Sequence, residues 1–221
     1  MTPFAGLTGF GGGPTGLTLA SGAAASIAWG GNRGVFMGGW TNIEVNTIDY
    51  IDIKTTGNAT DFGDTLNVIE GPACCSNGSR GIGMAGVEQA TRFDTIQYIT
   101  FATTGNSTDF GDCSAQKNAC GALSNGTRGV VGGGDAGGNF NVMEYVTIAT
   151  TGNPTDFGDL LSDNRSNGCA GNASRVVWGG GYNGSSQLNT IQYVTTQTTG
   201  DATDFGDLTN SRRSAGGSSG D

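Results

Sequence analysis

Residues 55–64 read Thr-Thr-Gly-Asn-Ala-Thr-Asp-Phe-Gly-Asp, and nearly the same ten residues return at 103–112, 150–159 and 198–207. Each copy carries one phenylalanine, and these are Phe62, Phe110, Phe157 and Phe205. Successive copies are spaced by 48, 47 and 48 residues. A fixed period of this length is the signature of a repeat architecture, in which each repeat is one unit of supersecondary structure. The rest of the chain is therefore interpreted in the register of this repeat.

Two further landmarks keep the same period. An arginine follows a short turn and precedes a run of small and apolar residues, at Arg33, Arg80, Arg128 and Arg175. A tyrosine stands two places after an apolar residue, at Tyr50, Tyr98, Tyr145 and Tyr193. These marks divide a repeat domain over residues 21–221 into units near 33–79, 80–127, 128–174 and 175–221. Residues 1–20 are a Gly-rich N-terminal arm outside the repeat.

Each unit is predicted to contain about four short strands. The first is small and polar, as in residues 164–170, and an Asn-Gly turn such as Asn125-Gly126 leads to the second. The third strand alternates, with Ile191 and Tyr193 on one face and Gln192 and Val194 on the other. The fourth carries the Asp-Phe-Gly-Asp element. No segment has a helical period with caps, so the sequence predicts an all-β fold.

The composition narrows the function classes. Glycine contributes 42 of the 221 residues, but it recurs at turns and strand ends, which is unlike collagen or a disordered chain. There is no histidine, which excludes Ser-His-Asp and Cys-His catalysis and histidine-ligated zinc. A net charge of −9 argues against nucleic-acid binding, and no apolar run is long enough to insert into a membrane. We expect no enzymatic activity, no catalytic residue, no cofactor and no metal.

The ends of the repeat domain allow two interpretations. The stretch 208–217 has the sequence of a first strand without the rest of its unit, and pairing it with the strands after Arg33 would close a ring of four units. We favour this closure. The alternative is that residues 21–28 are the first strand of the first unit, which leaves the C-terminal strand free to pair with a neighbouring subunit.

The unit resembles a kelch-type repeat. The resemblance rests on Arg165, the doublet Gly179-Gly180, Tyr193 and Phe205, with phenylalanine where kelch repeats usually carry tryptophan. The sequence of residues 145–159 is similar to that of repeat-bearing structural proteins of tailed phages, particularly those of marine cyanobacteria. The resemblance covers about residues 30–219. It implies a kelch-like β-propeller of about four blades and a non-enzymatic virion structural protein, such as a tail or head fibre or a capsid decoration.

Several residue groups could carry a site. The aspartates of the repeat could hold Ca²⁺, but we favour their capping of tight turns. Cys74, Cys75, Cys120 and Cys169 fall on the small-residue strand, where buried free thiols are expected. We expect the repeated arginine to pair with turn aspartates or backbone carbonyls.

Contacts with a partner are best sought in the loops that vary between units, because binding residues concentrate on loops held by a rigid scaffold. Their aromatic residues are candidates for a glycan platform: Trp40, Phe93, Phe140 and Tyr182. A carbohydrate-binding, host-recognition module is therefore the alternative function. The expected partners are other virion proteins, through residues 1–20, a host-surface glycan, and further copies of the chain.

Overall fold

The computed structural model describes residues 31–138 and 140–219. This part of the chain forms sixteen β-strands, which pair in four antiparallel sheets. The all-β class predicted from the repeat is confirmed. Among the described residues, no helix is long and apolar enough to cross a membrane. The N-terminal arm, and the first strand considered for residues 21–28, lie outside the described residues.

The four sheets follow one another along the chain. The first contains β1 (Arg33–Trp40), β2 (Glu44–Asp52) and β3 (Thr60–Asp64). The second contains β4 (Ala73–Ser76), β5 (Arg80–Met84), β6 (Val87–Glu88), β7 (Thr91–Thr100) and β8 (Thr108–Lys117). The third contains β9 (Gly121–Ser124), β10 (Arg128–Gly132), β11 (Val142–Thr147) and β12 (Thr155–Asp159). The fourth contains β13 (Gly168–Gly171), β14 (Arg175–Gly179), β15 (Thr190–Thr195) and β16 (Thr203–Asp207).

The landmarks of the repeat hold equivalent places in every sheet. The arginine opens β1, β5, β10 and β14, and the tyrosine lies in the strand that pairs with it, which is β2, β7, β11 or β15. The Asp-Phe-Gly-Asp element lies in the next strand, the fourth of the predicted unit, which is β3, β8, β12 or β16. The fourth strand carries a bulge in each unit: Gly63 pairs with Ile48, but Asp61 pairs with Asp49, so that Phe62 is the extra residue. Gly63 has a φ of 146°, a backbone conformation that residues with a Cβ rarely adopt. The bulge directs the phenylalanine out of its own ladder and toward the next sheet.

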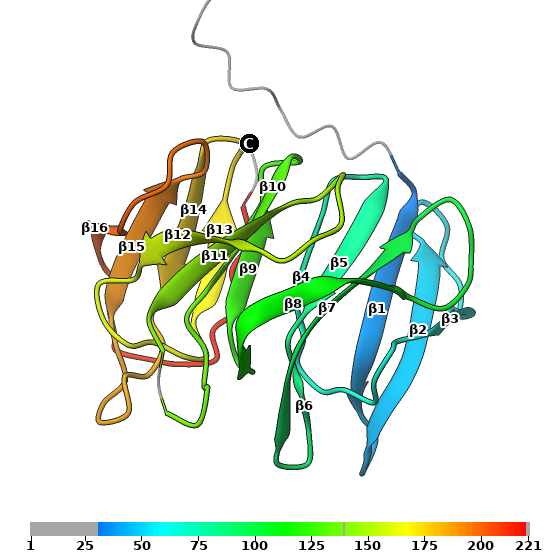
Figure 1. The fold of residues 1–221 in the computed structure, drawn as a ribbon, viewed down its shortest axis with the longest axis horizontal. Coiled ribbons are helices and arrows are strands. Elements are labelled where there is room, and N and C mark those ends of the chain that lie inside the picture. The colour runs from blue at the N-terminus through cyan, green and yellow to red at the C-terminus, as the bar shows by residue number, and fades with distance from the viewer. Residues whose placement is uncertain (1–30, 139, 220–221) are drawn as a thin grey trace, which may run out of the picture.

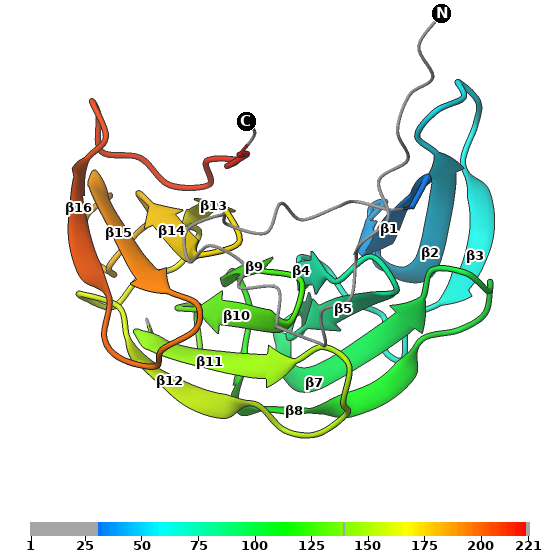
Figure 2. The same ribbon diagram turned by 90° about the horizontal axis from the view of Figure 1, so that it is seen from above.

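The sheets are arranged along an arc. Figure 2 shows β4, β9 and β13 gathered at the middle, while β3, β8, β12 and β16 form the outer side. The first sheet and β16 lie at opposite ends of the arc. This arrangement of blade-like sheets is compatible with a β-propeller.

The core consists of three clusters, one between each pair of consecutive sheets. Phe62 packs with Ile48 and with Ile99 of the second sheet. Phe110 packs with Ile96 and with Ile148 of the third. Phe157 lies in the third cluster with Met143 of its own sheet, and the fourth sheet adds Val176, Trp178 and Val194. The bulged phenylalanine therefore anchors each sheet to its successor, and the three are only 1–2 % exposed.

The C-terminal stretch does not complete the first sheet, so the expected closure of a four-unit ring by this pairing is wrong. The backbone N–H of Ser214 donates to the carbonyl of Ser166 at 2.7 Å, and Gly217 lies against the backbone of Cys169. The stretch thus packs on the fourth sheet beside β13. It follows the path that residues 160–167 take to β13, because Gly181 bonds Arg212 just as Gly134 bonds Asn164. The fourth sheet is therefore followed by the beginning of another unit.

Candidate functional site

Each unit holds its arginine against its tyrosine. The guanidinium carbon lies 4.7, 4.5, 4.4 and 4.2 Å from the tyrosine ring centre in the four units. The tyrosine in turn meets the phenylalanine edge-to-face, with ring centres 5.8–6.1 Å apart. Both are favourable aromatic geometries, which explains why these three residue types keep one register.

The arginine also connects its sheet to the next. Arg128 Nη1 donates to the carbonyls of Thr196 and Gln197 at 3.1 and 3.0 Å. Arg80 bonds Ile148 and Ala149 in the same way, and Arg33 bonds Phe101. The prediction that the arginine pairs with backbone carbonyls is confirmed. Among the described residues Arg175 has no such acceptor, because no sheet follows the fourth.

We expect Arg128→Ala to lower the free energy of unfolding by about 2–3 kcal/mol, since it removes a cation–π contact and two charge-assisted hydrogen bonds. Arg175→Ala is the matched control, because within one chain it removes only the contact with Tyr193 and should cost about 1 kcal/mol at protein concentrations too low for association. Urea denaturation followed by circular dichroism measures both. Equal losses would show that the bonds between sheets contribute nothing.

The same set of hydrogen bonds connects each sheet to the next, and we call this set the junction. A glycine N–H donates to the phenylalanine carbonyl of the preceding sheet at 2.6–2.7 Å, in the pairs Gly105–Phe62, Gly152–Phe110 and Gly200–Phe157. A side-chain Oδ1 accepts from the N–H of the last aspartate at 3.0 Å, in the pairs Asn106–Asp64, Asn153–Asp112 and Asp201–Asp159.

The residue before each tyrosine adds a further bond to the junction. Gln97 Oε1 accepts from the N–H of Leu66, Glu144 Oε1 from Ser114, and Gln192 Oε1 from Leu161. These three side chains are only 1–2 % exposed, so their hydrogen bonds are made away from water. The junction is therefore one repeated device of backbone and side-chain bonds around a buried phenylalanine.

The aspartates of the repeat do not cap tight turns as predicted, because Asp-Phe-Gly-Asp lies in strands β3, β8, β12 and β16. Turn capping falls to asparagine: Asn77 Oδ1 accepts from the N–H groups of Ser79 and Arg80, and Asn125 repeats the pattern. No group of three or more aspartate, glutamate or cysteine residues in the described chain is arranged to hold a metal ion.

The variable loops all connect the arginine strand to the tyrosine strand, and Figure 1 shows them together along the lower side of the molecule. We call this side the loop face. It includes the β1–β2 and β14–β15 loops and the hairpin of β6. The variable loops, in which contacts with a partner were expected, therefore lie on one side of the arrangement of sheets.

The four aromatic candidates on these loops differ in accessibility. Trp40 is 58 % exposed at the end of β1, and Ile43 next to it is 68 % exposed. Phe93 and Phe140 are half-buried, and the Lys117 ammonium lies 5.4 Å from the Phe140 ring centre. Tyr182 lies between the guanidinium groups of Arg165 and Arg213, at 5.2 and 5.1 Å. The structure therefore presents Trp40 to solvent, while Phe140 and Tyr182 are engaged within the protein.

Three ion pairs were not found from the sequence, and two of them share the Asp135 carboxylate. Asp135, in the β10–β11 loop, pairs with Arg92 at 3.0 Å and also with Arg165. Because Arg92 belongs to the second sheet and Arg165 precedes the fourth, one carboxylate connects the loops of three sheets. Such a network holds the loops in fixed relative positions.

The third ion pair, between Lys117 and Glu144, is buried. Lys117 Nζ lies 2.5 Å from Glu144 Oε2, and both side chains are almost inaccessible to solvent. Burial by itself raises the pKa of the Glu144 carboxyl, but the Lys117 charge and the hydrogen bonds from Lys117 and Ser114 outweigh it, so the pKa lies below its usual value. A signal was present in the sequence: Glu144 stands at the position of the buried Gln97 and Gln192, and Lys117 is one of two lysines.

The cysteines form no disulfide. Cys74 and Cys75 lie on β4 and Cys169 on β13, as predicted for the small-residue strand, and Cys120 directly precedes β9. The expected burial of these four thiols is wrong, because Cys74 is exposed and the other three are half-buried. Burial raises the pKa of the Cys75 and Cys113 thiols to about 12. These thiols therefore stay protonated near neutral pH and are poor nucleophiles.

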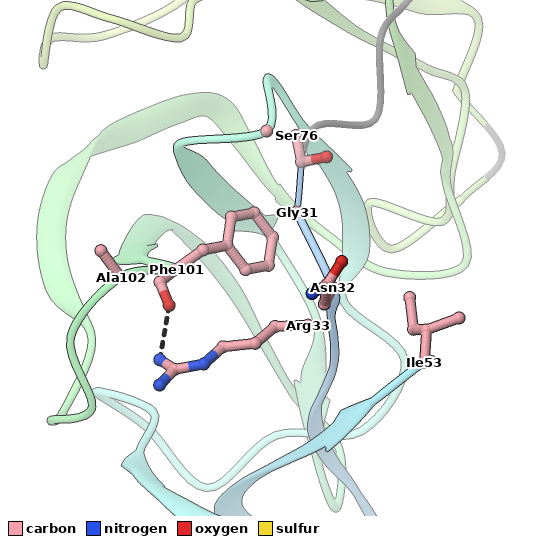
Figure 3. Close-up of a pocket in the computed structure, with 8 residues that line it drawn as sticks. Gly31, Asn32, Arg33, Ile53, Ser76, Phe101 and Ala102 are labelled. Carbon is pink, nitrogen blue, oxygen red and sulfur yellow. Dashed lines mark hydrogen bonds between the residues drawn. The ribbon is translucent and has the colours of Figure 1, made fainter. Parts of the chain in front are cut away.

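A pocket of about 530 Å³ lies between the first and second sheets. Figure 3 shows the Phe101 ring and Ile53 at its sides and the Arg33 guanidinium bonded to the Phe101 carbonyl. Ser76 lines it from β4. The lining is largely apolar, and its one charged group is already bonded to the protein, so the pocket offers shape but no free charge to a ligand.

Comparison with known proteins gives no further guide. No protein-family model matches the chain, and no curated protein has a similar sequence.

Proposed function

We propose that the chain is a non-enzymatic structural protein of a tailed-phage particle, such as a tail or head fibre or a capsid decoration, and that its sheets are blades of a kelch-like β-propeller. The observation that carries the proposal is the stack of four near-identical units whose variable loops share one face. The resemblance of residues 145–159 to repeats of phage structural proteins supports the same function. In this function the scaffold presents contacts to other virion proteins and performs no reaction.

Electron microscopy of the source particle with an antibody against this chain tests the proposal. We expect label at a fixed place on the virion, together with the chain among the proteins of purified particles. Absence of the chain from washed, purified particles would overturn the proposal.

A second function is favoured by Trp40. Its exposed indole lies on the loop face beside Ile43, and an aromatic plane is a common means of contacting the apolar face of a sugar ring. We propose host-surface glycan binding as this alternative. A glycan array decides it: Trp40→Ala should abolish a specific signal, while Leu161→Ala, at another exposed apolar residue, should preserve it. Binding that survives Trp40→Ala would exclude this site.

A further inference from the structure

The two ends of the arc carry the two halves of one junction. We propose that copies of this chain associate head-to-tail, with the free face of the fourth sheet of one copy bound to the free face of the first sheet of the next. The inference rests on the junction geometry and stands whatever the proposed function.

The face of the fourth sheet that points away from the third sheet, which we call the trailing face, is the acceptor half. The C-terminal stretch packs beside β13, but no described residue takes the place of the next sheet at β16. Phe205 is 55 % exposed, although the equivalent phenylalanines are 1–2 % exposed. A Cβ added to Gly63, Gly111 or Gly158 would lie 2.4–2.6 Å from the backbone of the next sheet. At Gly206, where φ is also positive, no described residue lies within 4 Å of the added Cβ. The trailing face therefore has the shape of the internal junctions without their partner.

The free face of the first sheet, which we call the leading face, is the matching donor half. Phe36 is 60 % and Ile53 65 % exposed. At the positions equivalent to Phe36, Val131 and Trp178 are fully buried, and at the position of Ile53, Ile148 is fully buried. The turn Thr55–Ala59 repeats the sequence that supplies Gly105 and Asn106 to the first junction, and its own Gly57 has open space around it.

If residues of the two faces pair as the equivalent residues pair at the junctions within one chain, each hydrogen bond of the junction has both its donor and its acceptor. Gly57 N–H would donate to the carbonyl of Phe205, and Asn58 Oδ1 would accept from the N–H of Asp207. The carboxylate of Asp49, which stands where Gln97 and Gln192 stand, would accept from the N–H of Thr209. Arg175 would gain the carbonyls of Ile53 and Lys54, the counterparts of Thr196 and Gln197 for Arg128.

A second copy is the occupant that the arrangement favours. The leading and trailing faces of one chain lie at opposite ends of the arc, so they meet only if the internal junctions open. A contact between two different faces is heterologous, and it repeats from copy to copy until the arc closes into a ring or extends as a filament. Burial of three large apolar side chains, Phe36, Ile53 and Phe205, drives the association.

Sedimentation velocity and light scattering on the full chain test the proposal. We expect wild type to form an oligomer, and Phe205→Asp and Ile53→Asp each to give monomers with unchanged circular dichroism. Leu161→Asp is the matched control, since Leu161 is 50 % exposed but lies on neither free face, and it should assemble as wild type does.

Mixing the two monomeric variants separates loss of association from loss of folding. The Phe205→Asp chain keeps an intact leading face and the Ile53→Asp chain an intact trailing face, so the mixture contains one functional junction. It should form a one-to-one heterodimer and nothing larger. A monomeric wild type, or an oligomer that both variants leave intact, would overturn the proposal.

Discussion

Glu144→Gln lowers the free energy of unfolding by about 3–5 kcal/mol, because it leaves the buried Lys117 ammonium without its counter-charge. The substitution keeps the side-chain oxygen that accepts the N–H of Ser114, so the loss reports the charge and not the junction bond. Guanidinium denaturation of both proteins measures it. A loss below about 1 kcal/mol would place the pair among the weakly contributing surface ion pairs.

The double variant Lys117→Met with Glu144→Gln is the control for this prediction. It removes both charges while preserving volume and the acceptor of Ser114, and it should recover most of the stability, as replacement of buried ion pairs often does. If the double variant were as unstable as the single one, shape and not charge would account for the loss.

The pH dependence gives an independent check of the same pair. Glu144 has a lowered pKa in the folded state, so its contribution is fully present above the unfolded value of about 4.3 and is lost as the pH falls through the folded pKa. The difference in stability between wild type and Glu144→Gln should therefore shrink as the pH falls below about 4.3. A difference independent of pH would mean that the pKa of the Glu144 carboxyl is the same in the folded and unfolded protein.

Gly111→Ala should destabilise the protein by about 3–5 kcal/mol, as the sum of backbone strain and overlap with the third sheet. Gly111 has a φ of 149°, and an added Cβ would lie 2.6 Å from the backbone of Gly152. The overlap is with main chain, which cannot rotate away as a side chain can. Thermal unfolding of the purified variant measures the effect.

Gly206→Ala separates the two causes. Gly206 has a φ of 135° at the equivalent position, but no atom of the described residues lies within 4 Å of its added Cβ, so only the strain of about 1–3 kcal/mol remains. In dilute solution, where chains are monomeric, we expect the smaller loss at residue 206. Equal losses at the two glycines would mean that the close approach of the sheets costs nothing.

The periodic residues allowed most of the fold to be predicted. Phe62 and its equivalents, with the arginine and tyrosine landmarks, gave the number of units and the order of strands, because each residue has the same neighbours in every unit. The turn at Asn125-Gly126 was predicted for a local reason, since its side chain caps its own turn. These features depend on contacts within one unit, or on contacts that recur between each unit and the next.

Several features that the sequence did not predict occur only once among the described residues. Lys117 and Glu144 are 27 residues apart, on strands of different sheets, and nothing periodic connects them. Asp135 meets Arg92 and Arg165 only after three loops have been brought to one face. The C-terminal stretch has the pattern of an inner strand, but the pattern does not decide which sheet it packs against. The aspartates of Asp-Phe-Gly-Asp were misassigned because a bulged strand and a tight turn share the same small and polar residues.

The likeness of the junctions has a consequence for how the gene can change. Removing residues 80–127 would bring Phe62 against the turn at residues 150–153, which presents the same glycine and asparagine as the turn at 103–106 that it now meets. Recombination between repeats can therefore delete or duplicate a whole unit and still leave the repeated backbone bonds of each junction with their partners, although this particular deletion also removes Lys117, the counter-charge of Glu144. The number of units, and with it the length of the arc, can vary on an evolutionary timescale while these repeated bonds are kept.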